Sequence, residues 1–268
     1  MTTHVPLPVQ TVLMTTRRHG VRALLMGGQA CILYGASEFS RDVDLAIYAH
    51  PDNLNRLQRA LEELRATVSA VPPFSADILM RGHAVHFRCA AADDMRLDVM
   101  AVMRNVPAFE ACWARRSIRS LDGIGDVDIM GLEDLVAAKK TRRDKDWPML
   151  RRLVDVHYSE FANEPTESRL NFWLRELRTP DALVDCVRRA PAAAARIGTT
   201  RDATARALEA ASNGGAFSAI GVSLADEEAR ERADDETYWR PLLEEQEAMR
   251  HAKRRAHAPP SDPAGPVV

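Results

Sequence analysis

Residues 21–48 read VRALLMGGQACILYGASEFSRDVDLAIY and contain two strand patterns separated by a pair of glycines. The first pattern, over 21–26, is short and apolar, which predicts a buried strand. Gly27-Gly28 then interrupts that strand, residues 29–34 are compatible with a short helix, and Gly35 ends the helix. The expected order is therefore strand, glycine turn, short helix, loop and strand.

The second strand of this stretch carries two aspartates, Asp42 and Asp44, one residue apart. Side chains alternate between the two faces of a strand, so both carboxylates are expected on the same side. Two like charges there are unfavourable unless a cation lies between them. A divalent metal bound through oxygen atoms meets that requirement. The same pattern also arises where one face of a strand is simply exposed to water.

The composition is that of an ordinary globular protein. The chain has 268 residues, of which 46% are hydrophobic and 28% charged, and its formal net charge is -2. This length fits one large domain or two small ones. The charge gives no global basic field, so any contact with nucleic acid would need a local patch. No apolar run approaches the roughly 20 residues that span a bilayer, so we expect no membrane association.

The cysteines are widely separated and form no paired motif; they are Cys31, Cys89, Cys112 and Cys186. We therefore expect neither disulfides nor a structural zinc site. The N-terminus lacks the charged start and apolar core of a secretory signal. Both observations favour a reducing cytoplasm.

Strand and helix patterns alternate up to about residue 158. Apolar periodicity predicts helices over 8–19, 51–64 and 148–158 and a helix that begins near residue 132. Strands are expected over 84–89 and 95–102, a loop over 71–76, and a hairpin over 118–130 that turns at Asp122-Gly123. Asp52 is the expected N-cap of the second helix.

After residue 163 the chain shows only helical patterns and helix breakers. Helices are expected over 168–177, 181–189 and 201–211, followed by a long charged helix over 225–255. The Pro-rich tail is expected to be disordered. We predict an α+β domain over residues 1–160, a helical C-terminal region over 161–255, and a disordered tail over 256–268.

A third acidic residue, Asp98, lies inside the apolar strand pattern MRLDVMAV. A carboxylate in such a strand is seldom buried without a partner, and a salt bridge to a nearby arginine is one explanation. If this strand neighbours the Asp42 strand, three carboxylates meet at the Gly27-Gly28 turn. Backbone N–H groups at such a turn bind phosphate. Three carboxylates and a phosphate form an oxygen cage for Mg²⁺.

Taken in order, Met26–Ala30, Arg41–Leu45 and Arg96–Met100 resemble the fingerprint of the nucleotidyltransferase superfamily related to DNA polymerase beta. That fingerprint is a Gly-Gly or Gly-Ser turn, an Asp-x-Asp pair and a third carboxylate on a later strand. The resemblance covers about residues 20–158 and implies a nucleotidyltransferase-like mixed β-sheet flanked by helices. LEDLVAAKK and RRDKDW also resemble the helix pair of small bacterial members, including toxin components of toxin–antitoxin systems. The helical C-terminal region resembles no family.

The resemblance implies Mg²⁺-dependent transfer of a nucleoside monophosphate from an NTP to an acceptor hydroxyl. Asp42 and Asp44 would hold two Mg²⁺ ions, and Asp98 would bind one of them and help to deprotonate the acceptor. The implied nucleotide-binding residues are Gly27, Gly28, Ser40, Lys139, Lys140, Arg143 and Asp146. The two lysines also fit a solvated face of a charge-rich helix.

The resemblance leaves the acceptor open between tRNA, a protein side chain and a small molecule such as an aminoglycoside. A cognate antitoxin is a further implied partner. The sequence departs from the family at Glu38, where many relatives carry a basic residue, because a negative charge is unfavourable near a triphosphate. Ser40 keeps a hydroxyl where many relatives have threonine, and Arg41 adds a cation.

Two other classes of function stay open. One is a catalytically silent module that binds a nucleotide or a partner with the same fold. The other is a structural protein in which the three aspartates form salt bridges.

Histidine and tryptophan residues have simpler interpretations. His83 and His86 are three apart on an expected strand, so they should face opposite sides and share no metal. His157 is expected at the surface. Trp147 either stacks on a base or caps the core.

Overall fold

The computed structural model describes residues 6–37, 39–69, 71–213 and 217–256. Within these ranges, seven strands form one sheet. They are β1 Ala23–Met26, β2 Asp42–Ile47, β3 Ala66–Val68, β4 Val85–Cys89, β5 Met95–Met100, β6 Ser117–Leu121 and β7 Gly125–Ile129.

The sheet is mixed, with the strand order β3-β4-β5-β2-β1-β7-β6. The pairs β2–β5 and β1–β7 are parallel, and the other neighbouring pairs are antiparallel. The two long aspartate-bearing strands, β2 and β5, are thus direct neighbours near the middle of the sheet. Their apolar positions alternate with the aspartates and are buried at Val43, Leu45, Leu97 and Val99.

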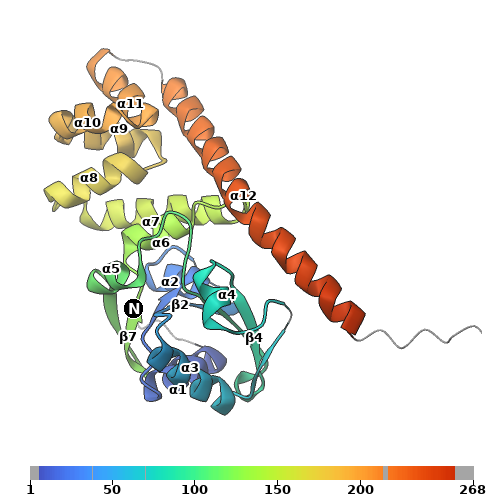
Figure 1. Cartoon of the computed structure of the whole chain (residues 1–268). Helices are drawn as coiled ribbons and strands as arrows, with labels where there is room; N and C mark the ends of the chain where they lie inside the picture. Colours follow the sequence, from blue (N-terminus) through green and yellow to red (C-terminus); the bar gives the residue numbers. More distant parts are fainter. Residues whose placement is uncertain (1–5, 38, 70, 214–216, 257–268) are drawn as a thin grey trace, which may run out of the picture.

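Helices pack around this sheet (Figure 1). Those of the first half are α1 Leu7–Arg18, α2 Gly27–Leu33, α3 Pro51–Glu63, α4 Ala76–Met80, α5 Phe109–Ala114, α6 Leu132–Ala138 and α7 Asp146–Phe161. Helices α1 and α3 contact each other, and α1 also contacts β2 and β5. The amphipathic pattern of both helices places Val12 and Leu57 fully inside the core.

The second half is entirely helical in the described residues. Its helices are α8 Glu167–Glu176, α9 Pro180–Arg189, α10 Pro191–Gly198, α11 Asp202–Asn213 and α12 Phe217–Ala256. Helices α8 to α11 lie beyond α7, and the 40-residue α12 runs from them back past the sheet (Figure 1). The predicted α+β architecture, a mixed sheet flanked by helices and followed by a helical region, is confirmed. The division into domains stays a prediction.

Several local predictions were wrong in informative ways. Gly27-Gly28 does not precede α2 but forms its first two residues. Asp52 is not an N-cap: His50 holds that position, Pro51 begins α3, and Asp52 lies in the first turn. His83 precedes β4 rather than lying on it. The tail from residue 257 lies outside the described residues.

The elements that were not predicted are β3, α4, α5, α10 and a short 3-10 helix, η1 Ala90–Ala92. Each has three to eight residues, which is too short to show a hydrophobic period. Among the described residues, no helix combines the length and apolar character that a bilayer crossing requires.

Candidate functional site

The register of β2 and β5 brings the three predicted aspartates together. Asp44 is paired with Asp98 across the parallel strands, and Asp42 precedes Asp44 by two positions on the same strand. Paired residues of neighbouring strands share a face, so all three carboxylates point to one side of the sheet. One oxygen atom from each carboxylate lies within 4.8 Å of the others.

The glycine turn lies directly against this cluster. Gly27 has φ +64°, a conformation that residues with a side chain rarely adopt. A Cβ atom at Gly27 would collide with the Asp44 carboxylate, and one at Gly28 would collide with the Ser40 hydroxyl. The backbone N–H of Gly28 donates a hydrogen bond to Asp44. The two glycines are therefore required because the backbone lies so close to the side chains of Asp44 and Ser40.

Asp44 is electrostatically unfavourable as an anion in this structure. Burial raises its pKa to about 6, and the negative charges of Asp42 and Asp98 add to the increase. The Lys139 charge and the Gly28 N–H act in the opposite direction but do not outweigh these effects. A cation between the carboxylates would relieve this repulsion.

Asp98 has cationic and polar partners instead. The guanidinium of Arg96 donates from Nε to Oδ1 at 2.8 Å and from Nη2 to Oδ2 at 2.7 Å. Nδ1 of His86, on the neighbouring strand β4, lies 2.8 Å from Asp98 Oδ1. Burial pushes the pKa of Asp98 upward, but hydrogen bonds to His86 and Arg96 outweigh it and leave the pKa lowered.

Sequence reasoning did not place His86 or Arg96 in the site. Arg96 lies two residues before Asp98, so the period of a strand puts both side chains on one face and would have revealed the pair. His86 is opposite Asp98 in the antiparallel β4–β5 pair. That neighbour relation depends on strand register, which the local sequence does not specify.

Ser40 lies beside Asp42 rather than apart from the cluster. Its hydroxyl donates to Asp42 Oδ1 at 2.9 Å. The Gln29 side chain, from α2, donates to the Asp42 carbonyl oxygen at 3.3 Å and fixes the start of β2 against the helix. Glu38, at which the sequence departs from the motif it resembles, lies outside the described residues.

The loop after α6 forms a second charged cluster, which we call the elbow (residues 139–146). Lys139 is buried, and its Nζ lies 3.1 Å from Asp146 Oδ1. Asp146 Oδ2 accepts from Thr141 Oγ1 at 2.7 Å and from Arg143 Nε at 2.7 Å. Burial raises the pKa of Asp146, but the charges of Lys139 and Arg143 outweigh it and leave the pKa lowered.

The two predicted lysines differ in their surroundings. The positive charge of Lys139 acts on Asp44, so the elbow and the aspartate cluster are electrostatically connected. Lys140 instead pairs with Glu176 of α8, with Nζ 2.9 Å from Oε2. Trp147 is a core residue, because it is buried and its indole N–H donates to the Thr141 carbonyl at 2.7 Å.

Helix α12 contacts the elbow through Asp235. The buried carboxylate of Asp235 accepts from the backbone N–H of Arg142 at 2.8 Å. Arg104, on the loop after β5, lies 3.4 Å from Asp235 and donates to the Lys140 carbonyl at 2.5 Å. The C-terminal region thus contacts the segment that carries Lys139 and Arg143.

The aspartate cluster has the chemistry of a site for a hard cation. Its candidate ligands are all carboxylate oxygens, which Mg²⁺ prefers. The absence of a Cβ at Gly27 lets the Asp44 carboxylate lie against the turn, and burial and the neighbouring carboxylates raise its pKa, so that a bound cation would stabilise its ionised form. The residues present therefore fit Mg²⁺ at Asp42, Asp44 and Asp98.

No protein-family model matches this chain, and no curated protein matches it. The crystal structure of JHP933 from Helicobacter pylori aligns at 14% identity and TM-score 0.36, covering 89% of this chain and 95% of that one. The crystal structure of a "putative nucleotidyltransferase" from H. pylori aligns at 14% identity and TM-score 0.32, covering 86% and 94%. Both TM-scores lie below 0.5, so function is inferred from this chain's own side chains.

Proposed function

We propose that this chain transfers a nucleoside monophosphate from an NTP to an acceptor hydroxyl in a Mg²⁺-dependent reaction. The observation that carries the proposal is the convergence of Asp42, Asp44 and Asp98 beside the Gly27-Gly28 turn. The motif order is that of the nucleotidyltransferase superfamily. Bound Mg²⁺ would neutralise the phosphates and lower the pKa of the acceptor hydroxyl.

In this reaction the acceptor oxygen forms a bond to the α-phosphorus, and the bond between that phosphorus and the bridging oxygen breaks. Pyrophosphate leaves with that oxygen, and the acceptor proton passes to Asp98. Asp42 and Asp44 would hold Mg²⁺, and backbone N–H groups of the Gly27-Gly28 turn would orient the phosphates. Lys139 and Arg143 add positive charge at the leaving group.

For the acceptor, we propose three classes of molecule rather than one substrate. Candidates are tRNA, a protein side chain and a small molecule, and a toxin–antitoxin role would add a cognate antitoxin as partner. No contact in the described residues distinguishes among these acceptors. The test therefore includes all three kinds.

A silent binding module is the second candidate, and the Asp98 ion pair favours it. Both Asp98 oxygens already accept from Arg96, which leaves that carboxylate less available to a metal. Such a module would bind NTP at the glycine turn and elbow without turnover.

The experiment measures transfer of label from each α-³²P-NTP with Mg²⁺, with and without total RNA, cell extract or an aminoglycoside. Wild type is compared with Asp42→Ala/Asp44→Ala, and Asp126→Asn, an exposed β7 aspartate, is the control. Transfer by wild type and Asp126→Asn, but not by the double variant, supports the enzyme.

The other outcomes are equally informative. NTP binding without transfer supports the silent module, and absence of both supports purely structural aspartates. Transfer that survives the double substitution rules out the metal-site assignment.

A further inference from the structure

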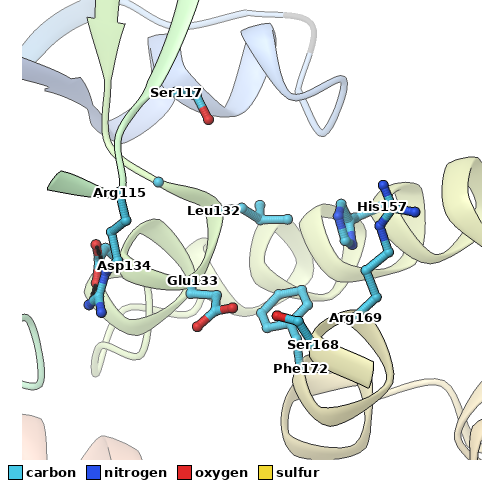
Figure 2. Close-up of a pocket in the computed structure, with 10 residues that line it drawn as sticks. Arg115, Ser117, Leu132, Glu133, Asp134, His157, Ser168, Arg169 and Phe172 are labelled. Carbon is cyan, nitrogen blue, oxygen red and sulfur yellow. Dashed lines mark hydrogen bonds and ion pairs between the residues drawn. The ribbon is translucent and has the colours of Figure 1, made fainter. Parts of the chain in front are cut away.

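A cavity of about 260 Å³ lies apart from the aspartates, between β6, α6, α7 and α8. Figure 2 shows Leu132 and Glu133 on one side of it and Phe172, Ser168 and Arg169 on the other. Ser117 lines it and accepts from Tyr34 Oη at 2.8 Å. Tyr34 ends α2, whereas the aspartates lie at the start of α2. A seven-residue helix is about 10 Å long, so the cavity is a separate site.

The cavity contains two opposite charges that do not neutralise each other. Glu133 makes no ion pair or hydrogen bond in the described part of the chain, and it is an exposed residue of the cavity lining. Arg169 has no carboxylate partner there either. Its Nη1 donates to the Glu164 carbonyl at 2.7 Å, and the guanidinium lies over the Phe161 ring. A guanidinium has five N–H donors, so several stay available to a ligand.

The other charged pair of the lining is already satisfied. Arg115 and Asp134 form a two-bond ion pair, with Nε 2.8 Å from Oδ2, so neither needs a ligand. Figure 2 shows this pair at the edge of the cavity, away from His157 and Arg169. Among the described residues, the charged groups of the lining without an ion-pair partner are thus the exposed Glu133 carboxylate and the half-buried Arg169 guanidinium.

His157 supplies a neutral donor next to the guanidinium. Its Nδ1 accepts the indole N–H of the buried Trp173 at 3.0 Å, so in the neutral ring the proton is on Nε2. Burial, together with the charge of Arg169, lowers the pKa of His157 and keeps the ring neutral near pH 7. His157 is therefore not the surface residue that its position near a helix end suggested.

We propose that this cavity binds a small zwitterion of the α-amino-acid type with an apolar side chain. The ligand ammonium would face Glu133, and its carboxylate would face Arg169 and the Nε2–H of His157. Its apolar part would contact Leu132 and Phe172. The volume is just below the range of about 300–1,000 Å³ for drug-sized ligands, which suits a molecule of this size. The inference is independent of the transferase proposal.

The test is calorimetric titration of the full chain with L-leucine at pH 7. Two analogues each lack one charge: 3-methylbutylamine has no carboxylate, and 4-methylpentanoate has no ammonium. We expect saturable binding of leucine and at least tenfold weaker binding of each analogue. Glu133→Gln and Arg169→Gln should each weaken leucine binding by at least tenfold.

Arg175→Gln is the matched control, because Arg175 is an exposed arginine on the same helix and does not line the cavity. It should bind leucine as wild type does, and so should Asp42→Ala/Asp44→Ala, which separates this site from catalysis. Thermal unfolding of each variant verifies that it is folded. The proposal is overturned if 10 mM leucine gives no saturable heat. It is also overturned if either analogue binds as well as leucine, or if folded Glu133→Gln and Arg169→Gln bind like wild type.

Discussion

Asp44 and Asp146 both lie within reach of the Lys139 charge, yet their pKa values shift in opposite directions. Asp146 has Lys139, Arg143 and Thr141 around it, and its charge is compensated within the fold. Asp44 faces two further carboxylates, and its pKa is raised to about 6. The Asp146 charge is thus compensated by the chain's own side chains, whereas a bound cation would compensate Asp44. This difference distinguishes a carboxylate that is paired within the fold from one that is a candidate metal ligand.

Removing the compensated carboxylate, that of Asp146, should lower the free energy of unfolding, and this is the largest effect that we expect. Asp146→Ala leaves the buried Lys139 ammonium without its partner, and breaking a buried pair in this way costs about 3–5 kcal/mol. Urea denaturation should show this loss in the free energy of unfolding. Asp144→Ala, at an exposed neighbour in the elbow, should leave that free energy within error. Equal free energies of unfolding for the two variants would show that Asp146 does not stabilise the buried Lys139.

Removing the uncompensated carboxylate, that of Asp44, should instead increase the free energy of unfolding. Asp44→Asn abolishes the repulsion by Asp42 and Asp98 but keeps an oxygen to accept the Gly28 N–H. In EDTA at pH 7 the free energy of unfolding should increase by about 1–3 kcal/mol, on the scale of 1.4 kcal/mol per pKa unit. Asp126→Asn serves as the control. A less stable Asp44→Asn protein would show that Asp44 is already compensated.

The pH dependence of metal binding should follow the Asp44 pKa of about 6. Because the folded protein holds this proton more tightly than the unfolded chain, ionisation of Asp44 makes stability in EDTA fall as pH rises from about 4 to 6. A metal must displace the same proton, so Mg²⁺ affinity should increase up to about tenfold per pH unit below 6 and level off above it. Urea denaturation in EDTA from pH 4 to 8 measures the stability, and calorimetric titration with Mg²⁺ from pH 5 to 8 measures the affinity. Affinity that is flat across this range would contradict the assignment.

The smallest effect is expected at Arg96. Arg96→Met removes a cation that occupies both Asp98 oxygens, so Mg²⁺ affinity should rise several-fold, which is about 1 kcal/mol or less. The control is Arg88→Met, at the exposed residue paired with Arg96 on β4. Weaker Mg²⁺ binding by Arg96→Met would instead make Arg96 a residue that orients Asp98 for the metal.

The sequence predicted those parts of the site that depend on local pattern. Strand alternation placed Asp42 and Asp44 on one face, and apolar runs located β2 and β5. The sequence alone does not determine their parallel pairing, which puts Asp44 opposite Asp98, because strand order is a tertiary property. The same limit hid His86, which reaches Asp98 only through the β4–β5 register. Lys139 and Lys140 could not be separated by spacing, and only the packing of α8 assigns Lys140 to Glu176.

The bond between Asp235 and the backbone of Arg142 has a consequence for biosynthesis. The strands that carry the three aspartates end at residue 100, but the elbow is fastened by a helix that begins at residue 217. During translation, domains fold from the N-terminus as the chain emerges. A nascent chain therefore contains the acidic cluster well before α12 can hold the elbow beside it. The elbow is therefore held in place only after α12 has been synthesised. A chain truncated before Asp235 would lack the hydrogen bond between Asp235 and the backbone of Arg142.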